Sequence, residues 1–278
     1  MSLRFTILGC GSSPGTPRIG GPDGRGDWGD CDPDNPKNRR TRCSLLVEKT
    51  GPDGVTRVVV DTSPDFRAQM LAAGVTGLDA AVYTHPHADH IHGVDDLRQF
   101  AILHRRRIDT YADEQTFERL YQGFGYCYET PEGSIYPPIL NHHPIRAGEI
   151  FAVPGAGGAI EMLPVLQEHG PISSLGFRFG GNLEKREGGL CYSPDISGVP
   201  DGSIADLSAL DVWIVDALQY REHISHFSLG QALDWIERLD AKTAILTHMH
   251  IPLDYERVKN ETPAHVEPAF DGMVIELD

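Results

Sequence analysis

Cysteine is scarce in this sequence of 278 residues, which contains only Cys10, Cys31, Cys43, Cys127 and Cys191. No two of them have the close spacing of a redox pair or a zinc knuckle. The number is odd and the positions are widely spread, which excludes a disulfide framework and is typical of a reducing compartment. We therefore expect a cytoplasmic protein.

Basic residues are also in the minority, with 24 Lys and Arg against 40 Asp and Glu and a formal net charge of −16. Such a charge opposes unaided binding of a polyanion, so we do not expect nucleic acid or an acidic membrane surface as a partner. The most basic cluster is Arg39, Arg40 and Arg42. An arginine run beside a strand is usually exposed to solvent, so we assign it no role.

Long apolar runs are absent as well. The N-terminal run at residues 3–8 is too short for a signal sequence or a membrane span. No repeat, low-complexity tract or linker divides the chain. With 40% hydrophobic residues to build a core, we expect one domain over residues 1–278.

Short β-branched and apolar runs alternate with amphipathic ones, which predicts a mixed α/β fold. Helices are predicted at residues 66–73, 95–106 and 228–239. The aromatic-rich segment 111–143 reads as irregular, either lining a pocket, covering a dimer contact or packing as a satellite cluster. Strands are predicted at residues 3–8, 43–48, 56–60, 78–83, 159–166, 175–179, 190–192, 212–215 and 243–246.

Imidazole and carboxylate groups are dense in residues 84–92, which read Thr-His-Pro-His-Ala-Asp-His-Ile-His. Residues two apart at the end of a strand project the same way, so His85 and His87 can converge on one ion while Asp89 and His90 reach a second. Imidazole and carboxylate are ligands for Zn, Mn or Fe(II). The absence of thiolate favours a catalytic over a structural site.

Metal-competent side chains also follow predicted strands farther along the chain, at His169, Asp195 and His248. A single His or Asp after a strand is most often a turn residue. Strand ends at one edge of a sheet are, however, where enzymes assemble sites from distant parts of the sequence. Together with residues 84–92, these positions predict a metal site. His92 finds no partner and is expected at the surface or in a supporting role.

This order of residues resembles the metallo-β-lactamase superfamily, whose signature is His-x-His-x-Asp-His followed by a distant His, then Asp, then His. The resemblance covers nearly the whole chain. It is closest to the phosphodiesterase branch that includes phosphoribosyl 1,2-cyclic phosphate phosphodiesterase, through the block from His226 to Leu229 and through Thr247 and His248. It implies an αββα sandwich in which two mixed β-sheets are flanked by helices.

The resemblance also implies a site for two divalent metal ions, Zn or Mn, joined by a bridging carboxylate. A hydroxide between the ions would attack phosphorus in line. The implied ligands are His85, His87 and His169 for the first ion, Asp89, His90 and His248 for the second, and Asp195 as the bridge.

Two residues are expected to act in catalysis, Asp89 and His226. The resemblance assigns His226 the protonation of the leaving oxygen or the binding of the phosphate, and His223 is its competitor three residues earlier. Asp61 is expected to accept a hydrogen bond from a ligand histidine rather than to bind metal.

These features predict hydrolysis of a small cyclic or nucleotide-like phosphodiester, in a monomer or a homodimer. Alternatives are a tRNA 3′ endonuclease, a thioester hydrolase and a catalytically silent metal-binding protein. A common zinc β-lactamase would carry Cys at Asp195, and a redox member would carry Glu at His87. The phosphonate-pathway enzymes have a cysteine-rich zinc knuckle where this chain offers only Cys31.

Overall fold

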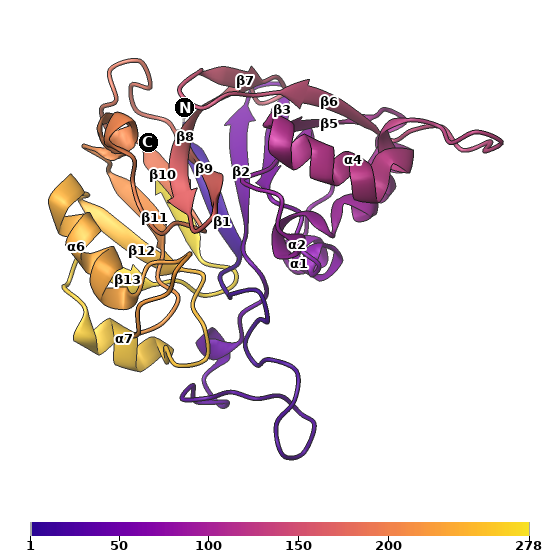
Figure 1. The fold of residues 1–278 in the computed structure, drawn as a ribbon. Helices are drawn as coiled ribbons and strands as arrows, with labels where there is room; N and C mark the ends of the chain where they lie inside the picture. The colour runs from indigo at the N-terminus through magenta and orange to yellow at the C-terminus, as the bar shows by residue number, and fades with distance from the viewer. Residues whose placement is uncertain (1, 278) are drawn as a thin grey trace.

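Two mixed β-sheets of seven strands each form the centre of the computed structural model, which describes residues 2–277 (Figure 1). The strands of the first sheet are β1 (Leu3–Gly9), β2 (Ser44–Gly51), β3 (Gly54–Val60), β4 (Ala80–Val82), β5 (Ile108–Ala112), β6 (Leu140–Pro144) and β14 (Val274–Leu277). Their order is β14-β1-β2-β3-β4-β5-β6, antiparallel as far as β3 and parallel beyond it. Leu3 lies opposite Leu277, so the N-terminal and C-terminal strands are neighbours.

The second sheet is built from the C-terminal half of the chain. Its strands are β7 (Phe151–Val153), β8 (Ile160–His169), β9 (Ile172–Phe179), β10 (Leu190–Ser193), β11 (Val212–Asp216), β12 (Thr243–Thr247) and β13 (Val266–Pro268). Their order is β13-β12-β11-β10-β9-β8-β7, parallel from β13 to β10 and antiparallel from β10 to β7.

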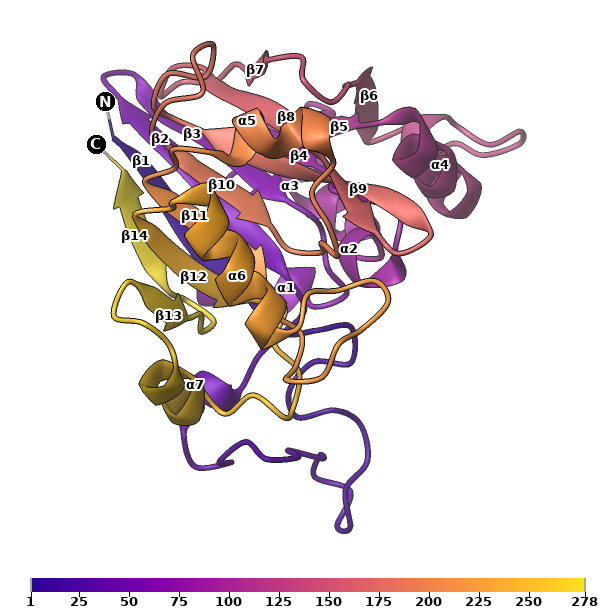
Figure 2. The same cartoon turned by 60° about the vertical axis from the view of Figure 1, so that its left-hand side comes forward.

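Helices cover the outer faces of both sheets, and Figure 2 shows α6 lying over β11 and β12. The expected αββα sandwich is thereby confirmed. Within residues 2–277, no helix is long and apolar enough to cross a membrane. The helices are α1 (Phe66–Ala72), α2 (Ala88–Ile91), α3 (Leu97–His104), α4 (Glu114–Tyr128), α5 (Ile204–Leu207), α6 (Leu229–Leu239) and α7 (Tyr255–Glu261), with the 3-10 turns η1 (Pro36–Asn38), η2 (Val94–Asp96) and η3 (Asp201–Ser203).

Alternation along the strands explains how one sheet serves two hydrophobic layers. In β3, Val58 and Val60 belong to the core between the sheets, whereas Val59 packs under α1, α3 and α4. All three are fully buried. Since successive side chains of a strand point to opposite faces, a continuous apolar run marks a strand that is covered on both sides.

The strands and helices predicted from the sequence are present, with ends shifted by a few residues. The interpretation of residues 111–143 as irregular was wrong, because Glu114–Tyr128 forms helix α4. Asp113 caps its N-terminus by accepting a hydrogen bond from the Thr116 amide at 2.9 Å. Glycines flank a non-helical Phe124, so the helix has a kink that obscured its periodicity.

The prediction of a solvent-exposed arginine run was also wrong for Arg40, which is 1% exposed. Its Nη2 donates hydrogen bonds to the Leu253 carbonyl at 2.7 Å and to Asn38 Oδ1 at 3.1 Å. These bonds fix residues 10–43, the long connection between β1 and β2 that extends below the sheets in Figure 1. Burial of this charge depends on the tertiary fold, which a local pattern does not reveal.

Substituting Arg40→Ala should lower the free energy of unfolding by about 3 kcal/mol, because it leaves the Leu253 carbonyl buried without its charged donor. Urea denaturation would measure this loss. Arg39→Ala is the matched control: Arg39 is exposed over the Trp28 ring at 5.0 Å and should cost less than about 1 kcal/mol. Equal losses for both variants would contradict an anchoring role for Arg40.

Candidate metal centre

The candidate centre lies where the ends of strands from both sheets meet. From the first sheet, His85 follows β4, and α2 carries Asp89 and His90. The second sheet contributes His169, Asp195 and His248, each at or just after the end of β8, β10 or β12. A backbone hydrogen bond from the Leu175 amide to the Thr84 carbonyl, 2.8 Å long, links the two sheets beside this edge.

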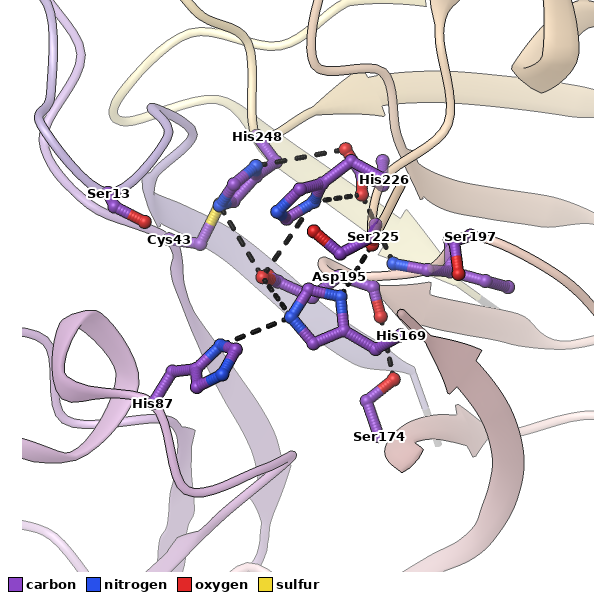
Figure 3. Close-up of polar contacts among 12 residues, drawn as sticks. Ser13, Cys43, His87, His169, Ser174, Asp195, Ser197, Ser225, His226 and His248 are labelled. Atoms are coloured by element: carbon purple, nitrogen blue, oxygen red, sulfur yellow. Dashed lines mark hydrogen bonds and ion pairs between the residues drawn. The ribbon is translucent and has the colours of Figure 1, made fainter. Parts of the chain in front are cut away.

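A first cluster contains His85, His87, His169 and Asp195, whose ligand atoms all lie within 4.8 Å of one another. His169 Nε2 and His87 Nδ1 face each other at 3.1 Å. Asp195 Oδ2 lies 3.7 Å from His85 Nε2 and 3.6 Å from His169 Nε2. Side chains from distant parts of the sequence therefore converge on one point (Figure 3).

A second cluster contains Asp89, His90 and His248, again with ligand atoms within 4.8 Å of one another. Asp195 faces this cluster too, because its Oδ1 lies 3.0 Å from His90 Nε2 and its Oδ2 lies 3.6 Å from His248 Nε2. One carboxylate thus stands between the two clusters. Both groups contain the residues that the sequence predicts as ligands.

Unpartnered buried atoms make these clusters suited to cations. Within residues 2–277, the buried Nε2 atoms of His85 and His248 face the centre without a hydrogen-bond partner, and His90 Nε2 and Asp195 Oδ1 lie 3.0 Å apart without hydrogen-bond geometry. Buried polar atoms without a partner are costly and need an explanation. Divalent cations at the two clusters would satisfy them, and imidazole with carboxylate is a donor set for Zn or Mn.

The pKa shifts of the histidines also suit the binding of divalent cations at the two clusters. Burial lowers the pKa of His169 to about 4, and it lowers that of His85 well below its usual value, so both rings favour the neutral form that binds metal. His90 is different: burial opposes its charge, but Asp195, Asp89 and Asp61 outweigh burial and raise its pKa. Its neighbouring carboxylates therefore attract positive charge to this position.

Asp61 accepts a hydrogen bond from one of the proposed ligand histidines, as the sequence predicts. It accepts hydrogen bonds from His90 Nδ1 at 2.7 Å and from the Thr84 amide and hydroxyl at 2.9 and 2.8 Å. The first bond directs His90 Nε2 toward Asp195. Asp61 and His248 both have positive φ, 64° and 56°. Strained backbone of this kind persists where the surrounding structure holds it, and it is common at functional sites.

Asp216, at the end of β11, is a site residue that was not identified from the sequence. It is fully buried, and its Oδ2 accepts hydrogen bonds from His226 Nδ1 at 2.7 Å and from the Ile196 amide at 3.1 Å. Its Oδ1 lies 3.8 Å from His248 Nδ1. The only sequence signal was an acidic residue after an apolar run, which Asp195 shares.

His226 lies beside both clusters and is 9% exposed. Its ring centroid is 4.5 Å from that of His248 and 4.8 Å from that of His169 (Figure 3). Its Nδ1 also lies 3.9 Å from Asp195 Oδ2. His226 therefore lies among the predicted ligands, and with Asp195 and His248 it forms a third group whose ligand atoms lie within 4.8 Å of one another.

Other candidate groups lie outside the clusters. His92 is exposed and packs against the Phe124 ring, in agreement with the surface role expected for it. His250, two residues after His248, also lies outside both clusters, and its Nδ1 contacts the Ser12 hydroxyl at 2.9 Å. Cys31 is buried with its thiol directed at backbone carbonyls. In the part of the chain that the structure describes, no cysteine joins a metal-competent group.

Comparison with known proteins gives one family match. The family model described as beta-lactamase superfamily domain matches residues 56–249, a range that includes every predicted ligand.

A solved structure, described as a new diphosphatase from the PhnP family, is 33% identical, with a TM-score of 0.84 over 100% of this chain and 98% of that chain. Coenzyme PQQ synthesis protein B of Cupriavidus necator is 25% identical over 86% of this chain and 88% of its own length. The octanoyltransferase of Porphyromonas gingivalis is 30% identical over 99% of this chain. The chain spans only about half of that protein, 52% of its length.

Substituting Asp61→Asn should weaken metal binding by about 10- to 100-fold, because it removes the charged acceptor that orients His90. Asn tolerates the positive φ of this position, so the backbone should be retained. Competition with a chelator would measure the affinity. Asp109→Asn, whose carboxylate contacts Asn141 and His143, is the control and should leave it unchanged; an unchanged affinity in Asp61→Asn would exclude the supporting role.

Proposed function

The chain belongs to the beta-lactamase superfamily, and from this membership and the two facing clusters we propose that it is a dinuclear metal-dependent phosphodiesterase. Its substrate would be a small cyclic or nucleotide-like phosphodiester. The observation that carries the proposal is the position of His226, an imidazole beside both clusters whose Nδ1 is bound to a buried carboxylate. Protonation of a leaving oxygen by a positioned side chain accelerates hydrolysis, and the imidazole of His226 is suited to that role.

The proposed ligands divide as the clusters do. One ion would be held by three imidazoles, the other by a carboxylate and two imidazoles, and the Asp195 carboxylate would serve both. Bound divalent cations supply an activated water at neutral pH and neutralise negative charge on the reacting phosphate. The residues are His85, His87 and His169 for the first ion, Asp89, His90 and His248 for the second, with Asp195 between them.

His226 would act through its Nε2. Because a carboxylate only accepts, the 2.7 Å contact with Asp216 places the proton of the neutral ring on Nδ1. Nε2 is then the atom that can take up and release a second proton. Burial lowers the pKa of His226, and the nearby Asp195 and Asp89 carboxylates oppose that shift. His226 would give this proton to the leaving oxygen or use it to bind the phosphate.

Asp89 would contribute to catalysis in addition to binding metal. Its side chain is 12% exposed, so its carboxylate borders both the second cluster and the solvent side. The Ser13 hydroxyl donates a hydrogen bond to Asp89 Oδ2 at 2.7 Å and holds it in place. A carboxylate in this position can accept the proton of the attacking water.

The net charge supports a small substrate. An acidic surface repels a polyanion, so a substrate phosphate would be attracted only locally, where cations are bound. A tRNA would need a basic surface along its backbone, and the charge of −16 opposes this alternative.

Diphosphate hydrolysis is a second candidate. The observation in its favour is the description of the 33% identical structure as a diphosphatase. The same clusters would suit either bond, because both substrates present a phosphoryl group with an oxygen leaving group. Comparing kcat/KM for bis(p-nitrophenyl) phosphate, cyclic nucleotides and dinucleoside diphosphates would distinguish the two reactions.

Removal of metal tests the proposed function directly. The purified protein should contain Zn or Mn by elemental analysis and hydrolyse bis(p-nitrophenyl) phosphate. A chelator should abolish turnover and added metal should restore it. Asp195→Ala should lower both metal content and kcat/KM, the latter by at least about 100-fold, since even residues behind the ligands contribute 10- to 100-fold. A metal-loaded protein that turns over none of the three substrate classes would contradict the proposed function and leave the other hydrolases and the silent metal-binding protein as the alternatives.

Two diesters with different leaving groups can show whether His226 protonates the leaving oxygen or binds the phosphate. His226→Ala should retain its metal and lose about 10²- to 10⁴-fold in kcat for a diester with an alkoxide leaving group. If His226 protonates the leaving oxygen, the loss should be much smaller with p-nitrophenolate, which leaves readily without a proton. Equal losses with both substrates would assign His226 to phosphate binding, and no loss with either would exclude it from the reaction.

A further inference from the structure

The connection between β11 and α6, residues 217–228, is fixed against the metal centre. The His169 Nδ1–H donates a hydrogen bond to the Ser225 carbonyl at 2.6 Å. The Phe227 amide donates to the Ile196 carbonyl at 2.8 Å, next to Asp195. Figure 3 shows Ser225 lying beside His169 and His226. Ser225 therefore has a defined position relative to a proposed metal ligand.

Ser225 in turn holds His223. The Ser225 amide and hydroxyl lie 3.4 and 3.2 Å from His223 Nδ1. A backbone N–H can only donate, so Nδ1 is the acceptor and the proton of the neutral ring is on Nε2. His223 is exposed to solvent, and its ring centroid is 5.3 Å from that of His226. An exposed imidazole that carries its proton on Nε2 thus lies next to His226.

The two histidines use their Nδ1 atoms differently: that of His226 donates a hydrogen bond and that of His223 accepts one. His226 donates its Nδ1 proton to Asp216, which leaves Nε2 available to exchange a proton. His223 accepts at Nδ1, which favours the tautomer that carries its proton on Nε2. A phosphoester needs both kinds of group, because its leaving oxygen takes up a proton and its other oxygens only accept hydrogen bonds. In the arginine run, Arg40 and Arg42 already pair with the Leu253 carbonyl and Asp65, and Arg39 lies over the Trp28 ring.

We propose that His223 is a substrate-contacting residue that donates a hydrogen bond from Nε2 to an oxygen of the bound phosphoester. The inference rests on the proposed function and extends it, since it assigns phosphate recognition to a residue outside both metal clusters. His223 is expected to bind substrate and transition state alike. Its loss should therefore affect KM more than kcat.

The test compares His223→Leu, which removes the donor, with His223→Gln, which keeps an N–H at similar reach. For metal-loaded protein, the dissociation constant of inorganic phosphate would be measured by calorimetry, and KM and kcat with bis(p-nitrophenyl) phosphate. His223→Leu should raise both the dissociation constant and KM by about 5- to 10-fold, the value of one neutral hydrogen bond. Its kcat should stay within about twofold, and His223→Gln should restore most of the affinity.

His265→Leu is the matched control, because His265 is an exposed histidine outside both clusters. Its variant should bind phosphate as the unaltered protein does. Unchanged binding in His223→Leu, or equal weakening in His223→Leu and His223→Gln, would overturn the proposal. Loss of metal in His223→Leu would do the same, because the residue would then support the clusters.

The inference and the proposed function can fail separately. A protein that hydrolyses none of the substrates disproves the phosphodiesterase, and the phosphate titration then still decides the role of His223. If phosphate does not bind but the diester is hydrolysed, the KM of His223→Leu relative to the unaltered protein decides the role of His223. Failure of both turnover and phosphate binding in the unaltered protein would overturn both proposals.

Discussion

The site depends on one buried carboxylate. Asp195 is 1% exposed, and its oxygens lie 3.0 to 3.9 Å from nitrogens of five imidazoles. A carboxylate in such a position must be compensated by positive charge and hydrogen bonds, because isolated burial of a charge is prohibitively costly. Burial raises its pKa, but His248, His90 and His85 outweigh burial and hold that pKa well below its usual value. The ionised form of Asp195 is therefore favoured at this position.

This requirement accounts for the use of both sheets. Neither sheet alone carries all the proposed ligands, since residues 84–92 follow β4 of the first sheet, whereas His169 and His248 lie at the ends of β8 and β12 of the second. The core between the sheets holds these ends at a fixed separation. Supporting carboxylates then restrict the rings: Asp61 orients His90, and Asp216 orients His226. The chain is acidic overall, and three of its buried acids, Asp61, Asp195 and Asp216, contact the imidazoles of the two clusters and His226.

Some parts of the fold and of the site could be predicted from the sequence, and others could not. The motif at 84–92 was recognisable because its ligand types are close together in sequence, and the sandwich followed from the resemblance it carries. Asp216 was not separable from other acids that end strands, since its role depends on His226 approaching from another element. The α4 helix was hidden by its glycines and its kink at Phe124. The burial of Arg40 depends on the Leu253 carbonyl, more than two hundred residues away.

The pairing of β1 with β14 also has a practical consequence. Leu3 and Leu277 lie opposite each other, whereas Gly9, at the other end of β1, leads into the loop whose Ser13 contacts Asp89. Both described ends of the chain are thus at the end of the sheet remote from the two candidate metal clusters. An affinity tag or a surface linker attached at either end would leave the clusters accessible, and a short linker joining the ends would permit circularly permuted forms.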